Sequence, residues 1–445
     1  MRSDHNLAYE LAARVSHLAA HPLPREVERE AQRAPLNSLA TAIAGCRAPA
    51  VVPLIEVGRF VTGRATASVP GTSERFDAIV AALVTGAAGH VLDFDDTHLA
   101  TFIHPGPSLV GTVLPVAEWR GNSGRDVLAA FALGCEVELR AGLGLTVEHY
   151  RRGWHVTGTC GVIGTAVAAS LLLGHDPRQL AGAVGIAVSQ TLGHQEGLGT
   201  GEKALHAGKA ASNGILAALL ADAGFTAPPD AFRSPGGFFD VLSDAPRPDE
   251  LVDDLGERWE LLADAYKPYP CAIVCHPVID AARSLATLVE PANIESVVVQ
   301  CNPLAIRLAG NPEPRDGLEA RLSIAHGVAV ALLDGEVGLA QYADPRVVAR
   351  DVHGLRRRVT LKPVAAVAAD EAIVEIRMRN GSQFYEHIAH ARGSRDRPLE
   401  DAELNVKVES LVEAVLPGRS EQLIAAATGL PNALNITSLI QAATP

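Results

Sequence analysis

Residues 155–174 read HVTGTCGVIGTAVAASLLLG, a run without Asp, Glu, Lys or Arg that consists mainly of glycine, alanine, threonine and aliphatic residues. A helix built from this run is apolar on nearly every face, and such helices are buried. Its small side chains allow the backbone of a neighbouring helix to approach closely. The stretch therefore predicts a buried helix in a bundle-like core.

Four further runs have helical character, at residues 73–92, 124–145, 175–193 and 203–224. Ser73 is expected to cap the first run, and Asp176 is expected to cap the third, with Pro177 at the first helical position. The fourth run should stop at Gly224. Residues 1–265 are therefore predicted to form a large all-helical domain.

The pattern changes after Tyr266. Two stretches, IESVVVQC and AIVEIRMR, combine β-branched residues with strand-like alternation, and a third, SQFYEHIA, follows the turn-forming pair Asn380-Gly381. Between the first two, RLSIAHGVAVALLDGEVGLAQYA reads as helix. Residues 266–390 are therefore expected to form a smaller α+β domain. Residues 391–445, which include a helical run after Pro398, are expected to rejoin the first domain. The predicted fold class is mainly α.

Composition narrows the class of protein. The chain has 445 residues, of which 48% are hydrophobic and 20% charged, as in a globular protein. Its net charge of −13 argues against a nucleic-acid partner, because phosphate binding needs clustered Lys and Arg. The first twenty residues carry charges and lack an apolar signal core. No uninterrupted apolar stretch approaches the roughly 20 residues that a membrane span needs. A soluble, cytoplasmic protein is expected.

The six cysteines do not suggest a disulfide scaffold in so long a chain. Cys271 and Cys275 could serve as metal ligands, but a tetrahedral site needs further ligands at matching spacing, and the other four cysteines are scattered. We expect reduced, mostly buried thiols and no metal.

The stretch DFDDTHLATFIHPGP, at 93–107, concentrates titratable side chains directly after an apolar run. Pro105 and Pro107 forbid continuation of the helix, which is predicted to end near Asp93. Carboxylates at a helix C-terminus are disfavoured by the helix dipole. The stretch is therefore either a solvated cap or one wall of a site.

Two glycine-rich helix starts carry further candidates. His155 lies at the start of a glycine-rich helix, where it is either a capping and packing residue or an acid–base group. The segment GLGTGEKALHAGKAA fails the phosphate-loop pattern, because Ala204 follows Lys203 and Glu202 precedes it. A turn that brings Lys203 and backbone amides to a helix start suits a carboxylate instead.

Lys267 lies in YKPYPCAIVCHP, at the predicted domain junction. Pro268 and Pro270 stiffen the backbone and fix the direction of the lysine. Such a lysine can face a cleft, although most lysines are simply solvated.

Together these segments resemble the MmgE/PrpD family, and the resemblance covers nearly the whole chain. The motifs occur in one order: GHVLDFDDTH, then HPG, GWHVTGTCGVIGTAVAASLLLG, GTGEKALHAGKAASNGILAALLADAGF, YKPYPCAIVCHPVIDAA, LSIAHGVAVALLDGEV and RPLEDAELNVKV. The resemblance implies a helical domain with a smaller α+β lid, a homodimer, an active site in the cleft, and no metal or organic cofactor.

The resemblance also implies site residues. We expect four to be catalytic (Asp93, His104, His155 and Lys203) and two to bind substrate (Thr97 and Lys267). His98 and His326 stand where the family often has aromatic residues, and we expect both to contribute to substrate binding. Asp95 and Asp96 are expected to support the site or to cap the helix.

The family's reactions pass through a carbanion or enolate next to a carboxylate. Histidine supplies an acid or base near neutral pH, and lysines supply positive charge where negative charge develops. The main hypothesis is a cofactor-independent lyase, a dehydratase or decarboxylase acting on a small di- or tricarboxylate. An isomerase or epimerase using the same proton abstraction is the alternative. A non-catalytic binding protein on the same fold is the third hypothesis.

Overall fold

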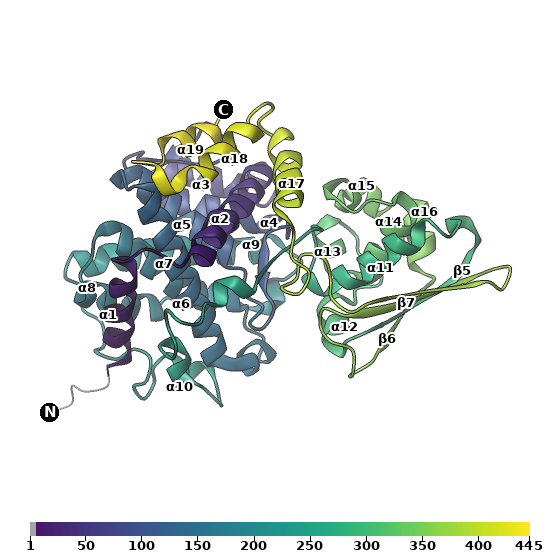
Figure 1. Cartoon of the computed structure of the whole chain (residues 1–445), viewed down its shortest axis with the longest axis horizontal. Coiled ribbons are helices and arrows are strands. Elements are labelled where there is room, and N and C mark those ends of the chain that lie inside the picture. The colour runs from purple at the N-terminus through teal and green to yellow at the C-terminus, as the bar shows by residue number, and fades with distance from the viewer. Residues whose placement is uncertain (1–5) are drawn as a thin grey trace. The chain divides into compact units, whose positions relative to one another are not determined.

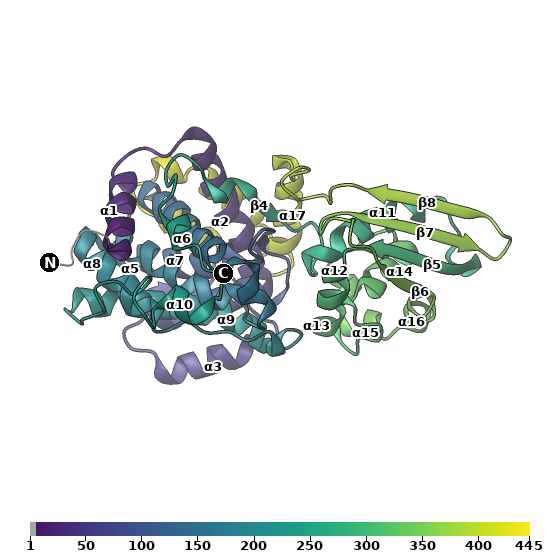
Figure 2. The same ribbon diagram turned by 90° about the horizontal axis from the view of Figure 1, so that it is seen from below.

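The computed structural model describes residues 6–445 and is mainly helical, as predicted. The chain forms two compact units. We call residues 6–91, 95–264 and 401–445 the helical unit, and residues 92–94 and 265–400 the mixed unit. Figures 1 and 2 label the elements of both units.

The helical unit contains most of the helices and only short strands. Its helices are α1 (Leu7–Ala19), α2 (Arg25–Gly45), α3 (Val52–Val61), α4 (Ala78–Val91), α5 (Pro105–Arg120), α6 (Gly124–Arg151), α7 (Val156–Leu173), α8 (Pro177–Val188), α9 (Gly201–Asp222), α10 (Phe238–Leu242), α17 (Asp401–Glu413), α18 (Ser420–Thr428) and α19 (Thr437–Ala442). Its strands are β1 (Ala67–Ser68), β2 (Arg75–Phe76) and β3 (Asp96–His98).

Glycines allow the core helices to approach closely. A Cβ added to Gly164 in α7 would lie 2.5 Å from the carbonyl oxygen of Gly134 in α6. One added to Gly208 in α9 would lie 2.2 Å from the carbonyl oxygen of Leu83 in α4. Any larger residue would push these backbones apart. The close approach predicted from the small residues of the α7 sequence is therefore confirmed.

Helix α7 corrects one statement about the sequence. Its 18 residues have a mean hydropathy of 1.8, enough by length and composition to cross a membrane, although no such stretch was expected. However, 89% of this stretch is buried inside the protein. A core helix surrounded by other helices needs the same apolar composition, which explains the hydropathy of α7.

Two helix starts test the capping predictions. Asp176 accepts hydrogen bonds from the backbone N–H groups of Arg178 and Gln179, so it caps α8 as predicted. Ser73 does not cap α4. Instead β2 follows it, and Asp77 accepts from the first backbone N–H groups of α4. Both residues are good N-caps by type, and the short strand β2 decides between them.

The mixed unit contains a four-stranded sheet in the order β6-β5-β7-β8. Only the β5–β6 pair is parallel. The strands are β5 (Ile294–Cys301), β6 (Val359–Pro363), β7 (Ala372–Met378) and β8 (Gln383–Ile388), and β4 (Asp264–Tyr266) precedes them. The helices are α11 (His276–Ala286), α12 (Pro303–Ala309), α13 (Gly317–Ala320), α14 (Ile324–Asp334), α15 (Asp344–Val347) and α16 (Arg350–Arg356).

Strands β5, β7 and β8 lie where the sequence predicts them, and Gly381, with φ of 86°, makes the turn between β7 and β8. Helix α11 packs against β7 and β8 (Figure 2). Strand β6 was not predicted. The helix expected over 321–343 is shorter, because Gly335 adopts φ of 72° and ends α14.

The C-terminal helices complete the helical unit. Helices α17 and α18 pack against α2, and Nζ of Lys407 donates a hydrogen bond to Oδ1 of Asn37 at 2.7 Å. Figure 1 shows α17 and α18 near α2, although these segments lie at opposite ends of the sequence.

Candidate active site

A short loop separates α4 from β3. Helix α4 ends at Val91, slightly earlier than the end near Asp93 that the sequence predicts. Asp93 has φ of 51°, a left-handed conformation that Asp tolerates better than most residues. The aspartates therefore lie beyond the helix, in the loop and in β3, and the expected conflict with the helix dipole does not arise.

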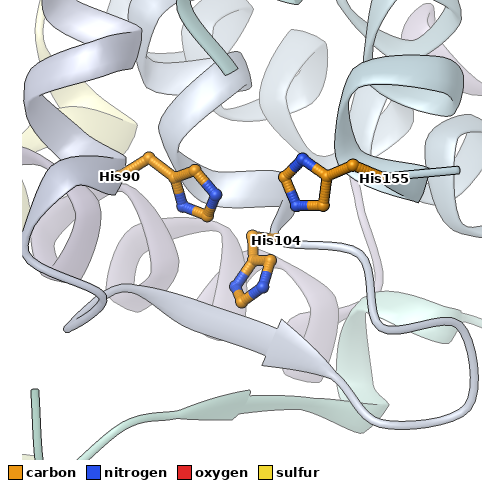
Figure 3. A group of neighbouring side chains, drawn as sticks. All are labelled: His90, His104 and His155. Carbon is orange, nitrogen blue, oxygen red and sulfur yellow. The ribbon is translucent and has the colours of Figure 1, made fainter. Parts of the chain in front are cut away.

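Three imidazole rings meet at helix ends of the helical unit. His90 lies in the last turn of α4, and His104 and His155 precede the first residues of α5 and α7. The ring centroid of His90 lies 4.7 Å from that of His104 and 5.7 Å from that of His155. The ring centroids of His104 and His155 lie 6.3 Å apart. Figure 3 shows His90 and His155 facing one another, with His104 beside the gap. We call these residues the histidine cluster.

Hydrogen bonds define the orientation of His104. Its Nδ1 lies 2.7 Å from the backbone oxygen of Asp96 and 3.1 Å from Oγ1 of Thr97. A carbonyl oxygen only accepts, so Nδ1 carries the proton and donates. In the neutral ring Nε2 then carries the lone pair. Thr157 accepts the backbone N–H of His104 through Oγ1 at 3.0 Å and fixes the start of α5.

Asp95 is a buried carboxylate that faces two of the rings. Its Oδ2 lies 2.5 Å from Nδ1 of His90 and 3.5 Å from Nδ1 of His104. A carboxylate at this distance favours a proton on the facing nitrogen of His90. The sequence suggests Asp95 as a supporting or capping residue, and in the structure its carboxylate lies beside His90 and His104.

His155 is connected to helix α9. Its Nδ1 lies 2.9 Å from Nδ1 of His206. Burial lowers the pKa of His155 well below its ordinary value, and the charges of neighbouring groups, including His90 and Lys203, lower it further. His155 is therefore neutral at neutral pH and able to accept a proton. Lys203 is in the first turn of α9, which begins at Gly201 after the cap Thr200.

Two buried carboxyl groups lie behind the cluster. Burial, together with the charge of Asp95, raises the pKa of Asp96 to about 7. Asp96 accepts the backbone N–H of Gly106 at 3.0 Å and thereby fixes the turn after His104. Burial also raises the pKa of Glu138 well above its ordinary value, and Ser108 donates to Glu138 at 3.3 Å. Both groups can therefore hold a proton that an exposed carboxylate would release.

Asp93 and Lys267 meet within the mixed unit. Nζ of Lys267 lies 2.5 Å from Oδ1 of Asp93, and both side chains are buried. The sequence named both as site residues without predicting that they form an ion pair. Arg321 is also buried, and burial lowers its pKa below the ordinary value. The negative charge of Asp93 offsets part of that decrease in pKa. Arg321 was not among the predicted residues.

His98 and His326 lie outside the histidine cluster. Nδ1 of His98 lies 2.9 Å from Oγ1 of Thr101, and Nε2 lies 3.3 Å from Glu260. His326 has no exposed surface; burial lowers its pKa to about 4, and its ring packs edge-on against Tyr342. These contacts hold both rings in place within the protein. The expected role of His98 and His326 in substrate binding stays a prediction.

Some of these side chains could hold a metal ion. Within residues 6–445, one ligand atom from each of His90, His104 and His155 lies within 4.8 Å of the others, all in buried positions. A mostly exposed group in the mixed unit, Asp370, His390 and Asp396, meets the same criterion. The six cysteines are buried and free of disulfides, as expected.

Sequence reasoning missed His90 and His206. Each had a signal: His90 lies in the quoted motif GHVLDFDDTH, and His206 lies one helical turn from Lys203 in the motif GTGEKALHAGKAA. An (i, i+3) spacing places Lys203 and His206 on one face of α9. The signal was weak because a histidine on an apolar helix is usually a packing residue.

The sequence is similar to known proteins over most of its length. A family model for the MmgE/PrpD N-terminal domain matches residues 9–251, and one for the MmgE/PrpD C-terminal domain matches residues 269–430. The chain is 25% identical over 458 residues to a cis-aconitate decarboxylase of Aspergillus terreus, which covers 96% of this chain and 93% of that protein.

Two further relatives have similar coverage. A cis-aconitate decarboxylase of Mus musculus is 27% identical over 429 residues, covering 91% of this chain and 86% of its own length. A 2-methylcitrate dehydratase of Escherichia coli (strain K12) is 26% identical over 442 residues, covering 88% of this chain and 86% of its own length. Since the two family models together match most of the sequence, the chain belongs to the MmgE/PrpD family.

Proposed function

We propose that this protein is a lyase, a dehydratase or decarboxylase that acts on a small di- or tricarboxylate. The observation that carries the proposal is the pairing of His104 with His155 at 6.3 Å, in a chain whose family includes cis-aconitate decarboxylases and a 2-methylcitrate dehydratase. The pair offers two imidazole rings, a residue type that can both accept and donate a proton.

Both reactions depend on proton transfer to or from positioned groups. In a dehydration, a base removes the proton from a carbon next to a carboxylate, the electron pair of that C–H bond forms the double bond, and the C–O bond breaks. The leaving hydroxide takes a proton from an acid and becomes water. In a decarboxylation the C–C bond breaks, CO₂ leaves, and the electron pair stays on the carbon, which then takes a proton from an acid.

His155 suits the role of base in this scheme, because its lowered pKa keeps it neutral. His104 is its partner in proton transfer. Thr97, which lies 3.1 Å from Nδ1 of His104, orients that ring. Lys203 and Lys267 anchor substrate carboxylates, since an acidic protein needs local positive charge to attract an anion. Asp93 holds Lys267 in position.

We further propose that the reaction needs no metal or organic cofactor. The histidine cluster has the composition of a metal site, so this part of the proposal has to be tested with a chelator rather than assumed. The protein is proposed to be soluble, cytoplasmic and homodimeric. Light scattering would then give a mass of about twice the 46.6 kDa of one chain.

The experiment that tests the function is incubation with a panel of di- and tricarboxylates in D₂O, followed by NMR. Loss of water or CO₂ from one member supports the lyase. Deuterium in the recovered substrate, without loss of water or CO₂, would show the epimerase or isomerase instead. Binding without exchange or product across the panel would favour a non-catalytic binding protein.

A further inference from the structure

The contact between His155 and His206 is a hydrogen bond between two Nδ1 atoms, at 2.9 Å. One of the two nitrogens must carry a proton and donate, and the other must accept. A neutral imidazole has one N–H, so the choice made at this bond decides which nitrogen of each ring remains unprotonated. The opposite nitrogen of His155 is Nε2.

The surroundings of His206 favour one choice. Its Nε2 lies 3.7 Å from a carboxylate oxygen of Glu202, one helical turn earlier in α9. This is an ion-pair contact rather than a good hydrogen bond, yet the negative charge favours an N–H on the nitrogen that faces it. With Nε2 protonated, neutral His206 has its lone pair on Nδ1. That lone pair accepts the proton of His155 Nδ1.

We propose that His206, backed by Glu202, is a positioning residue that holds His155 as the Nδ1–H tautomer and so leaves Nε2 of His155 free to accept a proton. The proposal rests on the proposed function for its catalytic consequence, but the tautomer itself is a property of the resting protein. Neither His206 nor Glu202 needs to contact the substrate.

The environment of His155 Nε2 agrees with this assignment. The atom is buried and has no hydrogen-bond partner among residues 6–445. A buried N–H without an acceptor leaves a strong donor unsatisfied. A buried lone pair without a donor costs less free energy at the same place. The charges that face His155 come from His90, His104 and Lys203, and all of them oppose a second proton on the ring.

Burial and the neighbouring charges also act on His206. Burial lowers the pKa of His206, and the charges of His90 and His194 lower it further, while Glu202 raises it. His206 is only 5% exposed at the side chain, so water does not readily replace its bond to His155. The tautomers of His155 and His206 are therefore linked through the bond between their Nδ1 atoms. The carboxylate of Glu202 determines which of the two nitrogens carries the proton.

The test is ¹⁵N NMR of the histidine rings in the full chain, which distinguishes protonated from unprotonated ring nitrogens without substrate. In the wild type we expect His155 to be protonated at Nδ1 and unprotonated at Nε2. The opposite pattern would overturn the proposal. This readout does not depend on turnover, so it stands even if the carboxylate panel yields no product.

Variants then connect the tautomer to rate. His206→Leu removes the acceptor and should move His155 toward the Nε2–H form, with kcat lower by about tenfold or more and KM little changed. His206→Asn supplies a side-chain oxygen as acceptor and should restore most of the rate and the Nδ1–H signal. Glu202→Gln should shift the tautomer in the same direction as His206→Leu, but less.

A matched control lies at the other end of α9. Asp222 faces His175 at 3.8 Å, much as Glu202 faces His206, but away from the histidine cluster. Asp222→Asn should leave the signals of His155 and kcat unchanged. If His206→Leu folds and leaves both the His155 tautomer and kcat as in the wild type, the inference is wrong. If His206→Leu does not fold, His206→Asn decides, because loss of rate with an unaltered tautomer would equally refute it.

Discussion

Nζ of Lys267 lies 2.5 Å from Oδ1 of Asp93, a residue 174 positions earlier in the chain. Lys267 has no exposed surface, and Asp93 is only 4% exposed. A lysine this deeply buried has given up its hydration shell, and the carboxylate compensates for part of that loss. The contact with a substrate carboxylate that we propose for Lys267 would therefore be made from within an existing ion pair.

Replacing Lys267 should consequently affect stability as well as substrate binding. Lys267→Met leaves Asp93 without its closest counter-ion and should destabilise the fold by about 3–5 kcal/mol. The double variant Asp93→Asn with Lys267→Met should recover much of this loss, as measured by thermal or denaturant unfolding. Arg315→Ala, which breaks the exposed pair with Glu319, is the control and should change little. Additive effects of the two single substitutions would show that the pair is not coupled.

Lys203 should act on both substrate affinity and the pH profile. Its positive charge helps to lower the pKa of His155, so Lys203→Ala should raise that pKa and move the acidic limb of kcat/KM to higher pH. KM should rise, because a carboxylate loses its cation. Lys209→Ala, on the same helix, is the matched control. A Lys203 variant with the KM and pH profile of the wild type would show that the lysine does not contribute to the site.

His104 and His155 should be the residues whose loss costs the most rate. Removing a general acid or base lowers the rate by about 10²–10⁴-fold, so His104→Ala and His155→Ala should each lose that much kcat while Tm stays near that of the wild type. His98→Ala and His326→Ala are the comparison variants, since both residues lie outside the cluster. If His98→Ala and His326→Ala abolish activity while His104→Ala and His155→Ala retain it, His98 and His326 are the proton-transfer residues instead.

The raised pKa of Asp96 predicts a pH-dependent stability difference. In the folded protein Asp96 keeps its proton up to about pH 7, whereas in an unfolded chain its pKa returns to the ordinary value of 3.8. The folded state therefore loses stability as pH rises between these two values. Asp96→Asn cannot titrate and still offers an oxygen to Gly106, so its Tm relative to the wild type should increase over that range. A constant difference from pH 4 to 8 would contradict the assignment.

Chelation should leave the activity unchanged. Dialysis against a strong chelator, with metal analysis of the protein before and after, measures this directly. Activity that disappears on treatment and returns with Zn²⁺ or Fe²⁺ would show that the histidine cluster holds a metal, and the cofactor-free part of the proposed function would then be wrong. Asp370→Asn removes one member of the candidate metal group formed by Asp370, His390 and Asp396 and controls for an effect there.

The sequence predicts this fold well where local pattern and packing agree. The α7 run is apolar on all sides, and only a buried helix accommodates that composition. Prediction failed where the deciding interaction is distant in sequence or depends on a single turn. Ser73 and Asp77 are equally good caps, and the pairing of β2 with β1 selects Asp77. Strand β6, which was missed, lies at an edge of the sheet, where it pairs with β5 far from it in sequence.

The candidate site shows the same division. His104 and His155 could be named because each lies beside a helix start in a recognisable motif. His90 lies in a motif as well, but it was missed because its position beside them depends on how α4, α5 and α7 pack. The pair Asp93 and Lys267 was named residue by residue, but their contact joins distant segments and became visible only in three dimensions.

The helical unit is not continuous along the chain, and this sets an order of assembly. Lys407 in α17 bonds Asn37 in α2, 370 positions earlier, so the bundle lacks part of its covering until the end of the chain has been synthesised. The mixed unit, which apart from residues 92–94 is one uninterrupted segment, has all its strands and helices by residue 400. On the ribosome, the later and smaller unit can therefore be complete before the earlier and larger one.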